Sequence, residues 1–259
     1  MKERIITATC LLAIVLPLIF LGGYWFVGLG LIATVIAVWE MVNLSDNSNK
    51  TFTLMKCLIM TFTVRIVFIP DTMWALRGIV AYILLIFLIE VFLGNLKKGN
   101  MKLYAVTIFY IGLSFRALLE VRNHSLTLFI LLVATVILTD SAAYFTGRFF
   151  GKNKLAPKIS PNKTIEGAVG GWLIGGGFAF VFGLMNNLFT ETWILIVLAI
   201  SLPILSQIGD LIASGLKRKY GVKDYGKIFP GHGGVMDRVD SQMLAGILMY
   251  VIILMGGVL

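Results

Sequence analysis

Long apolar runs separated by short polar stretches dominate this chain, and their lengths match those of membrane-spanning helices. A spanning helix needs about 20 predominantly apolar residues. By that measure the pattern predicts about nine transmembrane helices. Their expected ranges are 5–21, 24–42, 53–69, 73–93, 103–119, 126–145, 168–185, 193–211 and 242–258. The first two runs are separated so narrowly that a re-entrant hairpin is an alternative to two spans.

The pattern therefore predicts an all-α, polytopic integral membrane protein. Residues 1–123 would form an N-terminal region of about five spans, and residues 124–259 a catalytic transmembrane region with two basic loops. Composition agrees, because 58% of the 259 residues are hydrophobic and only 14% are charged. A soluble domain of this size is far less apolar.

The distribution of lysine and arginine indicates an orientation. With the N-terminus in the cytoplasm, the basic loops fall on the cytoplasmic side, as the positive-inside rule requires. The net charge of +9 also suits anionic partners such as lipid headgroups or nucleotides. Nucleic acid is disfavoured, because the charge lies in short loops and not on a soluble domain. The short N-terminus suits a bacterial inner membrane.

The densest group of charges lies between two apolar runs, at residues 214–240. Its charged members are Lys217, Arg218, Lys219, Lys223, Asp224, Lys227, Asp237, Arg238 and Asp240. Such a density of charge is costly in an apolar protein unless the charged residues bind a charged ligand. Residues 230–234 read Pro-Gly-His-Gly-Gly, which can adopt positive φ and bring backbone N–H groups close to a ligand. Basic groups, amides and carboxylates together indicate a site for polyphosphate with a divalent metal.

The preceding apolar run becomes polar on one face. Ser206, Asp210, Ser214 and Lys217 recur at helical spacing. Asp210 has apolar neighbours and would be driven towards its neutral form unless it met a cation. Pairing with an arginine is one interpretation. Metal binding is favoured, because Asp237 is expected to lie at the same membrane surface and could supply a second carboxylate.

A second basic loop, at residues 147–167, follows a run in which Asp140, Tyr144 and Arg148 share one helix face. Its prolines exclude a regular helix. Thr164 is expected to cap the next helix, and Glu166 would lie close enough to reach a metal or a ribose. An ordinary basic cytoplasmic loop is the alternative.

Small residues recur every four positions in the run that follows this loop. They are Gly167, Gly171, Gly175, Ala179 and Gly183. Such a stripe is typical of close helix packing in membranes. We interpret it as structural.

Two basic loops, aspartates at membrane depth and a glycine-rich turn together favour phosphoryl or nucleotidyl transfer at the bilayer surface. Mg²⁺ fits, because it takes one or two carboxylates and leaves its other positions to water and phosphate. The chain shows no Walker-type loop and no Ser-His-Asp arrangement. The charges of the first half receive no catalytic role; they are Arg65, Arg77, Glu90, Arg116 and Glu120.

Two motifs in the second half resemble those of the phosphatidate cytidylyltransferase family, also called CDP-diacylglycerol synthases. The first comprises Ser214, Lys217, Arg218, Lys223, Asp224, Gly226, Phe229, Pro230, His232, Gly233, Gly234, Asp237, Arg238 and Asp240. The second comprises Asp140, Ala143, Tyr144, Phe145, Gly147, Arg148, Phe150, Gly151, Lys152, Lys154, Leu155, Ile159, Ser160, Pro161, Lys163, Thr164, Glu166 and Gly167. The first half of the chain matches only as a set of apolar spans.

The resemblance implies that CTP and phosphatidate react to give CDP-diacylglycerol and pyrophosphate, in a multi-span homodimer. It implies that Asp210 and Asp237 hold Mg²⁺, with a second cation such as K⁺ as an option, and that Lys217 and Arg238 join them as catalytic groups. The implied substrate-binding residues are Asp140, Arg148, Lys163, Glu166, Ser214, Arg218, Lys223, His232 and Asp240. For His232 a purely structural role in the turn is the alternative.

Two rival functions remain at this stage. A secondary transporter or channel would also place acidic residues in spans, but it predicts binding without product. A related enzyme could use CTP on a different lipid phosphate or alcohol.

Overall fold

The computed structural model describes residues 2–44, 59–61, 63–64, 67–68 and 107–259. The described chain is mostly helical and divides into two compact units. The first comprises Met1–Arg116 and Asp224–Met236, and the second comprises Ala117–Lys223 and Asp237–Leu259. The expected spans 53–69 and 73–93 lie largely or wholly outside the described residues.

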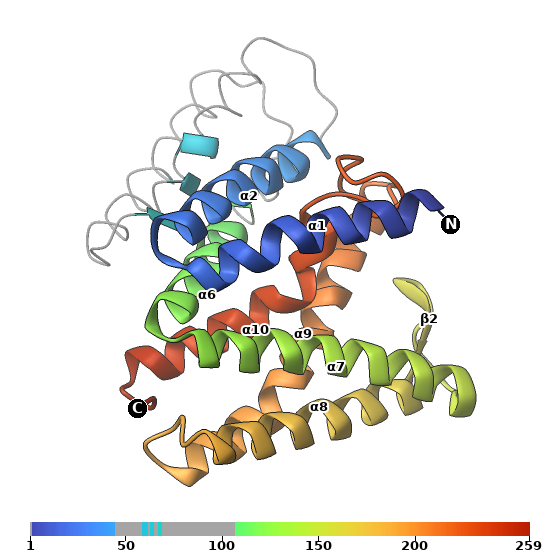
Figure 1. Cartoon of the computed structure of the whole chain (residues 1–259). Coiled ribbons are helices and arrows are strands. Elements are labelled where there is room, and N and C mark those ends of the chain that lie inside the picture. The colour runs from blue at the N-terminus through green and yellow to red at the C-terminus, as the bar shows by residue number, and fades with distance from the viewer. Residues whose placement is uncertain (1, 45–58, 62, 65–66, 69–106) are drawn as a thin grey trace, which may run out of the picture. The chain divides into compact units, whose positions relative to one another are not determined.

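In the first unit, two helices follow one another almost without a loop. Helix α1 (Lys2–Leu21) and helix α2 (Gly23–Asn43) are separated by Gly22 alone. Gly22 and Gly23 have φ of 65° and 49°, a backbone conformation that glycine adopts without steric cost. The two helices consequently pack side by side, in blue in Figure 1. A π-helical turn, η1 (Thr107–Ile111), leads into α6 (Gly112–His124), with which the chain enters the second unit.

The second unit is built on four helices, α7 (Leu126–Phe150), α8 (Ile165–Met185), α9 (Thr192–Lys219) and α10 (Met236–Leu254). Helices α7 and α8 run side by side, in green and yellow-orange in Figure 1. The predicted small-residue stripe is confirmed, because its five members are the buried residues of α8. A Cβ on Gly171 would lie 2.6 Å from the backbone oxygen of Thr139, so α7 approaches α8 at backbone distance.

A short β-hairpin joins α7 to α8. Strand β1 (Lys154–Ala156) pairs antiparallel with β2 (Ser160–Thr164). The all-α prediction did not include these strands. The prolines correctly excluded helix from the loop, but the pairing itself depends on how the loop folds back on itself. As predicted, Thr164 caps α8, because its Oγ1 accepts a hydrogen bond from Gly167 N at 3.1 Å.

Within the described part of the chain, four helices are long and apolar enough to cross a membrane: α2, α7, α8 and α9. They support the prediction of a helical membrane protein, whereas the count of about nine spans is not confirmed. The expected run 5–21 corresponds to α1, whose apolar part is shorter. The expected run 242–258 largely overlaps α10, which is not among the four.

Candidate active site

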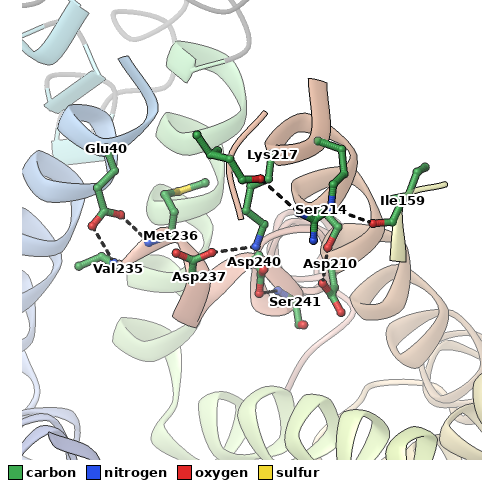
Figure 2. A network of polar contacts seen from close by, with 12 residues as sticks. Glu40, Ile159, Asp210, Ser214, Lys217, Val235, Met236, Asp237, Asp240 and Ser241 are labelled. Carbon is green, nitrogen blue, oxygen red and sulfur yellow. Dashed lines mark hydrogen bonds and ion pairs between the residues drawn. The ribbon is translucent and has the colours of Figure 1, made fainter. Parts of the chain in front are cut away.

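Four elements of the second unit bring acidic and basic side chains together. Strand β2 supplies Lys163, whose Nζ lies 2.6 Å from Oδ2 of Asp210 on α9. Helix α9 also supplies Lys217, whose Nζ lies 2.8 Å from Oδ1 of Asp237 on α10 (Figure 2). Two aspartates that the sequence singled out as metal ligands are therefore each paired with a lysine. The sequence had offered an arginine as the alternative partner of Asp210, and the cation found there is a lysine.

Helical periodicity places the α9 members of this group on one face, as predicted. Asp210, Ser214 and Lys217 follow at intervals of four and three residues. Ser214 Oγ donates a hydrogen bond of 3.3 Å to Asp210 Oδ1. The Lys217 and Asp237 side chains are only 10% and 5% exposed. In a pair buried so deeply, each charge offsets part of the desolvation cost of the other.

Asp240, one turn after Asp237 on α10, adds a third carboxylate. It is 9% exposed, and its Oδ1 accepts a hydrogen bond of 2.9 Å from Ser241 N. Asp240 lies outside the four candidate spanning helices. Burial and, second, the negative charge of Asp210 raise the pKa of the Asp240 carboxyl to about 7. A cation beside Asp240 would lower this pKa again.

Asp140 on α7 completes the cluster. It is close enough to Asp210, Lys163 and Ser241 to interact with each of them. Together with Asp237 and Asp240, four carboxylates thus share a region into which β2 and α9 bring Lys163 and Lys217. Negative charge exceeds positive charge within this cluster, an electrostatic setting that favours a bound cation.

The donor chemistry of the cluster fits Mg²⁺. Among the residues that the structure describes, no group of three or more His, Cys, Asp or Glu side chains is arranged to hold a metal ion. Mg²⁺ does not require such a group, because one or two carboxylates suffice when water and substrate phosphates supply the other ligands. Asp210 and Asp237 are hard oxygen donors of this kind, although each carboxylate would have to contact both its lysine partner and the ion.

Two other predicted site residues flank the hairpin, Glu166 on α8 and Arg148 on α7. The Glu166 carboxylate accepts hydrogen bonds from Lys152 N, from Asn153 N and, at 2.9 Å, from Asn153 Nδ2. These bonds tie Glu166 to the loop backbone, so it has a structural role, and contact with a metal or ribose stays a prediction. Arg148 NH1 donates a hydrogen bond of 3.0 Å to Tyr144 Oη, which confirms that these two side chains share a helix face.

The remaining basic residues of the motif lie at or after the end of α9. Arg218 donates from Nε to Ile159 O and from NH1 to Val222 O, each at 3.3 Å, and so links α9 to the hairpin. Lys223 and Arg238 are exposed to solvent. That Lys223 and Arg238 contact phosphate stays a prediction.

The glycine-rich turn belongs to the first unit. Gly231 and Gly233 have φ of 74° and 80°, so the positive φ predicted for this stretch is confirmed. His232 N donates a hydrogen bond of 2.8 Å to Phe229 O, which closes the turn. Its Nδ1 is buried and has no hydrogen-bond partner among the described residues. Both interpretations of His232, structural and substrate-binding, remain.

Sequence reasoning missed Glu40. This residue of α2 is 4% exposed, and its carboxylate accepts hydrogen bonds of 3.0 Å from both Val235 N and Met236 N (Figure 2). All three residues belong to the first unit. One signal was available, since Glu40 is the lone charge in the apolar run 24–42. An ionisable residue within a span is by default a functional candidate.

Comparisons with known proteins agree with the motifs. The model of the cytidylyltransferase family matches residues 2–255. A Staphylococcus epidermidis protein named phosphatidate cytidylyltransferase is 36% identical over 250 residues, which cover 94% of this chain and 95% of that protein. Proteins of the same name from Staphylococcus saprophyticus and Staphylococcus aureus are each 34% identical over the same shares of both chains. Since the similarity extends over nearly the whole sequence, the chain belongs to the cytidylyltransferase family.

Proposed function

We propose that this protein is a phosphatidate cytidylyltransferase, which makes CDP-diacylglycerol and pyrophosphate from CTP and phosphatidate. The observation that carries the proposal is the 36% identity, over 94% of this chain, to a relative with that name. The charged cluster on β2, α7, α9 and α10 supplies groups suited to the reaction. The match to the cytidylyltransferase family is not expected of a transporter.

The reaction is an exchange at one phosphorus atom. A phosphate oxygen of phosphatidate forms a bond to the α-phosphorus of CTP, and the bond from that phosphorus to the oxygen bridging to the β-phosphate breaks. The bond electrons leave with pyrophosphate. The protein therefore has to hold two anionic substrates in line and stabilise charge on the leaving group.

The basic residues would serve the phosphates. Lys217 lies within the cluster, and Lys163 reaches it from the hairpin. We propose that both exchange part of their contact with aspartate for contact with substrate phosphate. Arg238 is exposed one residue after Asp237 and would reach the leaving pyrophosphate. Arg148, Arg218 and Lys223 would hold phosphates at the cytoplasmic rim.

The acidic residues would hold the metal. Asp210 and Asp237 are the proposed Mg²⁺ ligands. A second cation such as K⁺ would lie near Asp240, whose pKa is raised to about 7 by burial and, second, by the negative charge of Asp210. When bound, Mg²⁺ would offset the negative charge of the phosphates. Ser214 keeps the Asp210 carboxylate oriented through its hydrogen bond, and Asp140 extends the polar surface along α7.

The substrates explain why such a site belongs in a membrane protein. Phosphatidate keeps its acyl chains in the bilayer, whereas CTP arrives from water. The proposed orientation, with the N-terminus and both basic loops in the cytoplasm, gives CTP access to the charged cluster. The bacterial relatives support the inner membrane as the location. A homodimer is proposed from the family resemblance alone.

The test is product formation by purified protein in liposomes. Phosphatidate and Mg²⁺ are supplied with CTP, UTP, ATP or GTP, and both pyrophosphate and CDP-diacylglycerol are measured. We expect both products with CTP only, none after chelation of Mg²⁺, and recovery on its return. Asp210→Asn and Asp237→Asn should remove turnover, whereas Glu191→Gln, at an exposed position on α9's other end, should not. Absence of product from folded wild-type protein would refute the proposal.

A further inference from the structure

Glu40 carries a buried charge that the proposed reaction does not use directly. Its side chain belongs to the apolar helix α2 and is 4% exposed. Removing a carboxylate from water is unfavourable unless hydrogen bonds replace its hydration. A residue kept at such a cost needs a compensating contact, and the structure supplies one from a distant part of the sequence.

That contact is the start of α10. The Glu40 carboxylate accepts one hydrogen bond from Val235 N and one from Met236 N, 195 and 196 residues later in the chain. Met236 is the first residue of α10. The first N–H groups of a helix have no partner within the helix, and a negative charge beside them is stabilised by the helix dipole. Glu40 therefore acts as a helix cap supplied by another helix.

Two glycines leave room for this carboxylate. A Cβ on Gly234 would collide with the Glu40 carboxylate, whose atoms are its three nearest neighbours, and a Cβ on Gly226 would collide with it as well. Neither glycine is among those with positive φ. Turn geometry thus does not require glycine at these two positions, whereas the close approach of Glu40 does.

The capped turn leads directly into the candidate active site. Asp237 is the second residue of α10 and Asp240 follows one turn later, so both inherit the direction in which α10 begins. The geometry points to Glu40 as a positioning residue for nucleotidyl transfer: its carboxylate holds the first turn of α10 and thereby the orientation of Asp237 and Asp240. This inference rests on the proposed function. A misplacement of about 1 Å in such a group reduces turnover about 10²-fold.

The first test replaces one oxygen. Glu40→Gln keeps the shape of the side chain but turns an amide N–H₂ towards a backbone N–H. We expect kcat to fall about 10²-fold, with KM for CTP within about threefold, because all the proposed phosphate-binding residues except Arg238 lie on elements other than α10. Glu191→Gln is the matched control, since Glu191 is exposed at the N-cap of α9 and makes no capping hydrogen bond there. It should keep the wild-type kcat.

The second test uses the glycine. Gly234→Ala should push the Glu40 carboxylate away from α10 and lower kcat as Glu40→Gln does. In a Glu40→Ala background the colliding atoms are gone, so adding Gly234→Ala should lower kcat no further. If the two defects were independent, their fold-reductions in kcat would instead multiply. This non-additivity separates a shared contact from general damage at either position.

The outcomes are decisive when turnover is divided by the folded fraction, measured by thermal unfolding of each variant in detergent. Reduced kcat per folded molecule, a nearly unchanged KM and non-additivity would support the inference. Wild-type kcat in Glu40→Gln, or a loss that only follows the folded fraction, would overturn it and leave the proposed function intact. Absence of product from the wild-type protein would overturn both.

Discussion

The close packing of α7 against α8 can be tested at Gly171. A Cβ at this position would lie 2.6 Å from Thr139 O and 2.9 Å from Ala143 Cβ, both on α7. Thr139 O is a backbone atom, so a rotamer change cannot relieve the contact. Reaching an ordinary separation of 3.4 Å would require the helices to part by about 0.8 Å. Gly171→Ala should therefore weaken the packing of α8 and displace the hairpin that precedes it.

The expected magnitude follows from two opposing effects. Overpacking a tight interface costs about 1–3 kcal/mol, whereas alanine is favoured over glycine within a helix by about 1 kcal/mol. The net destabilisation is about 0–2 kcal/mol. For a protein of this size that corresponds to a fall in Tm of up to about 8 °C. Lys163 precedes α8 in β2, so turnover should decrease as well.

Gly177→Ala on the same helix is the matched control. A Cβ there would have nothing within 4 Å, and Gly177 is exposed. Thermal unfolding of both variants can be followed by tryptophan fluorescence in the same detergent. Gly177→Ala should keep or raise Tm. Equal Tm values for the two variants would refute the proposed backbone contact between α7 and α8.

Two further changes test contacts within the second unit. Lys217→Met removes one partner of the buried ion pair and should destabilise the protein by about 3–5 kcal/mol in denaturant unfolding. Adding Asp237→Asn to Lys217→Met should recover part of that loss. Equal stability of the single and double variants would show that the two charges are not coupled. Thr164→Ala removes the cap of α8 and should cost about 1 kcal/mol, while Thr164→Ser should retain the cap; equal Tm values for the two would argue against the capping bond.

Much of the local structure could be predicted from the sequence. The apolar runs anticipated α2, α7, α8 and α9, because a span must bury its backbone polar groups within one continuous helix. The cap at Thr164 and the polar face of α9 could also be predicted. Each involves residues only three or four positions apart, so helical geometry alone determines which of them meet.

Part of the candidate site could be predicted only as a set of residue types. The motifs contained Lys163, Asp210, Lys217 and Asp237, but spacing did not show which lysine would meet which aspartate. Glu166 was expected to lie close enough to reach a metal or a ribose, and only the structure shows that its carboxylate accepts hydrogen bonds from Lys152 N and Asn153 N. The strands of that hairpin were not predicted, because neither strand carries the alternating pattern of a longer sheet.

The sequence by itself determined that the chain is a helical membrane protein of this family and that the charged residues of its two motifs lie in the second half. Those properties follow from composition, periodicity and motifs, which need no partner from elsewhere in the chain. Only the tertiary structure decided that Glu40 caps α10 and that lysines pair with Asp210 and Asp237. The physical reason is that burial makes these charges depend on their neighbours, and helix packing, not sequence distance, determines which neighbours they have.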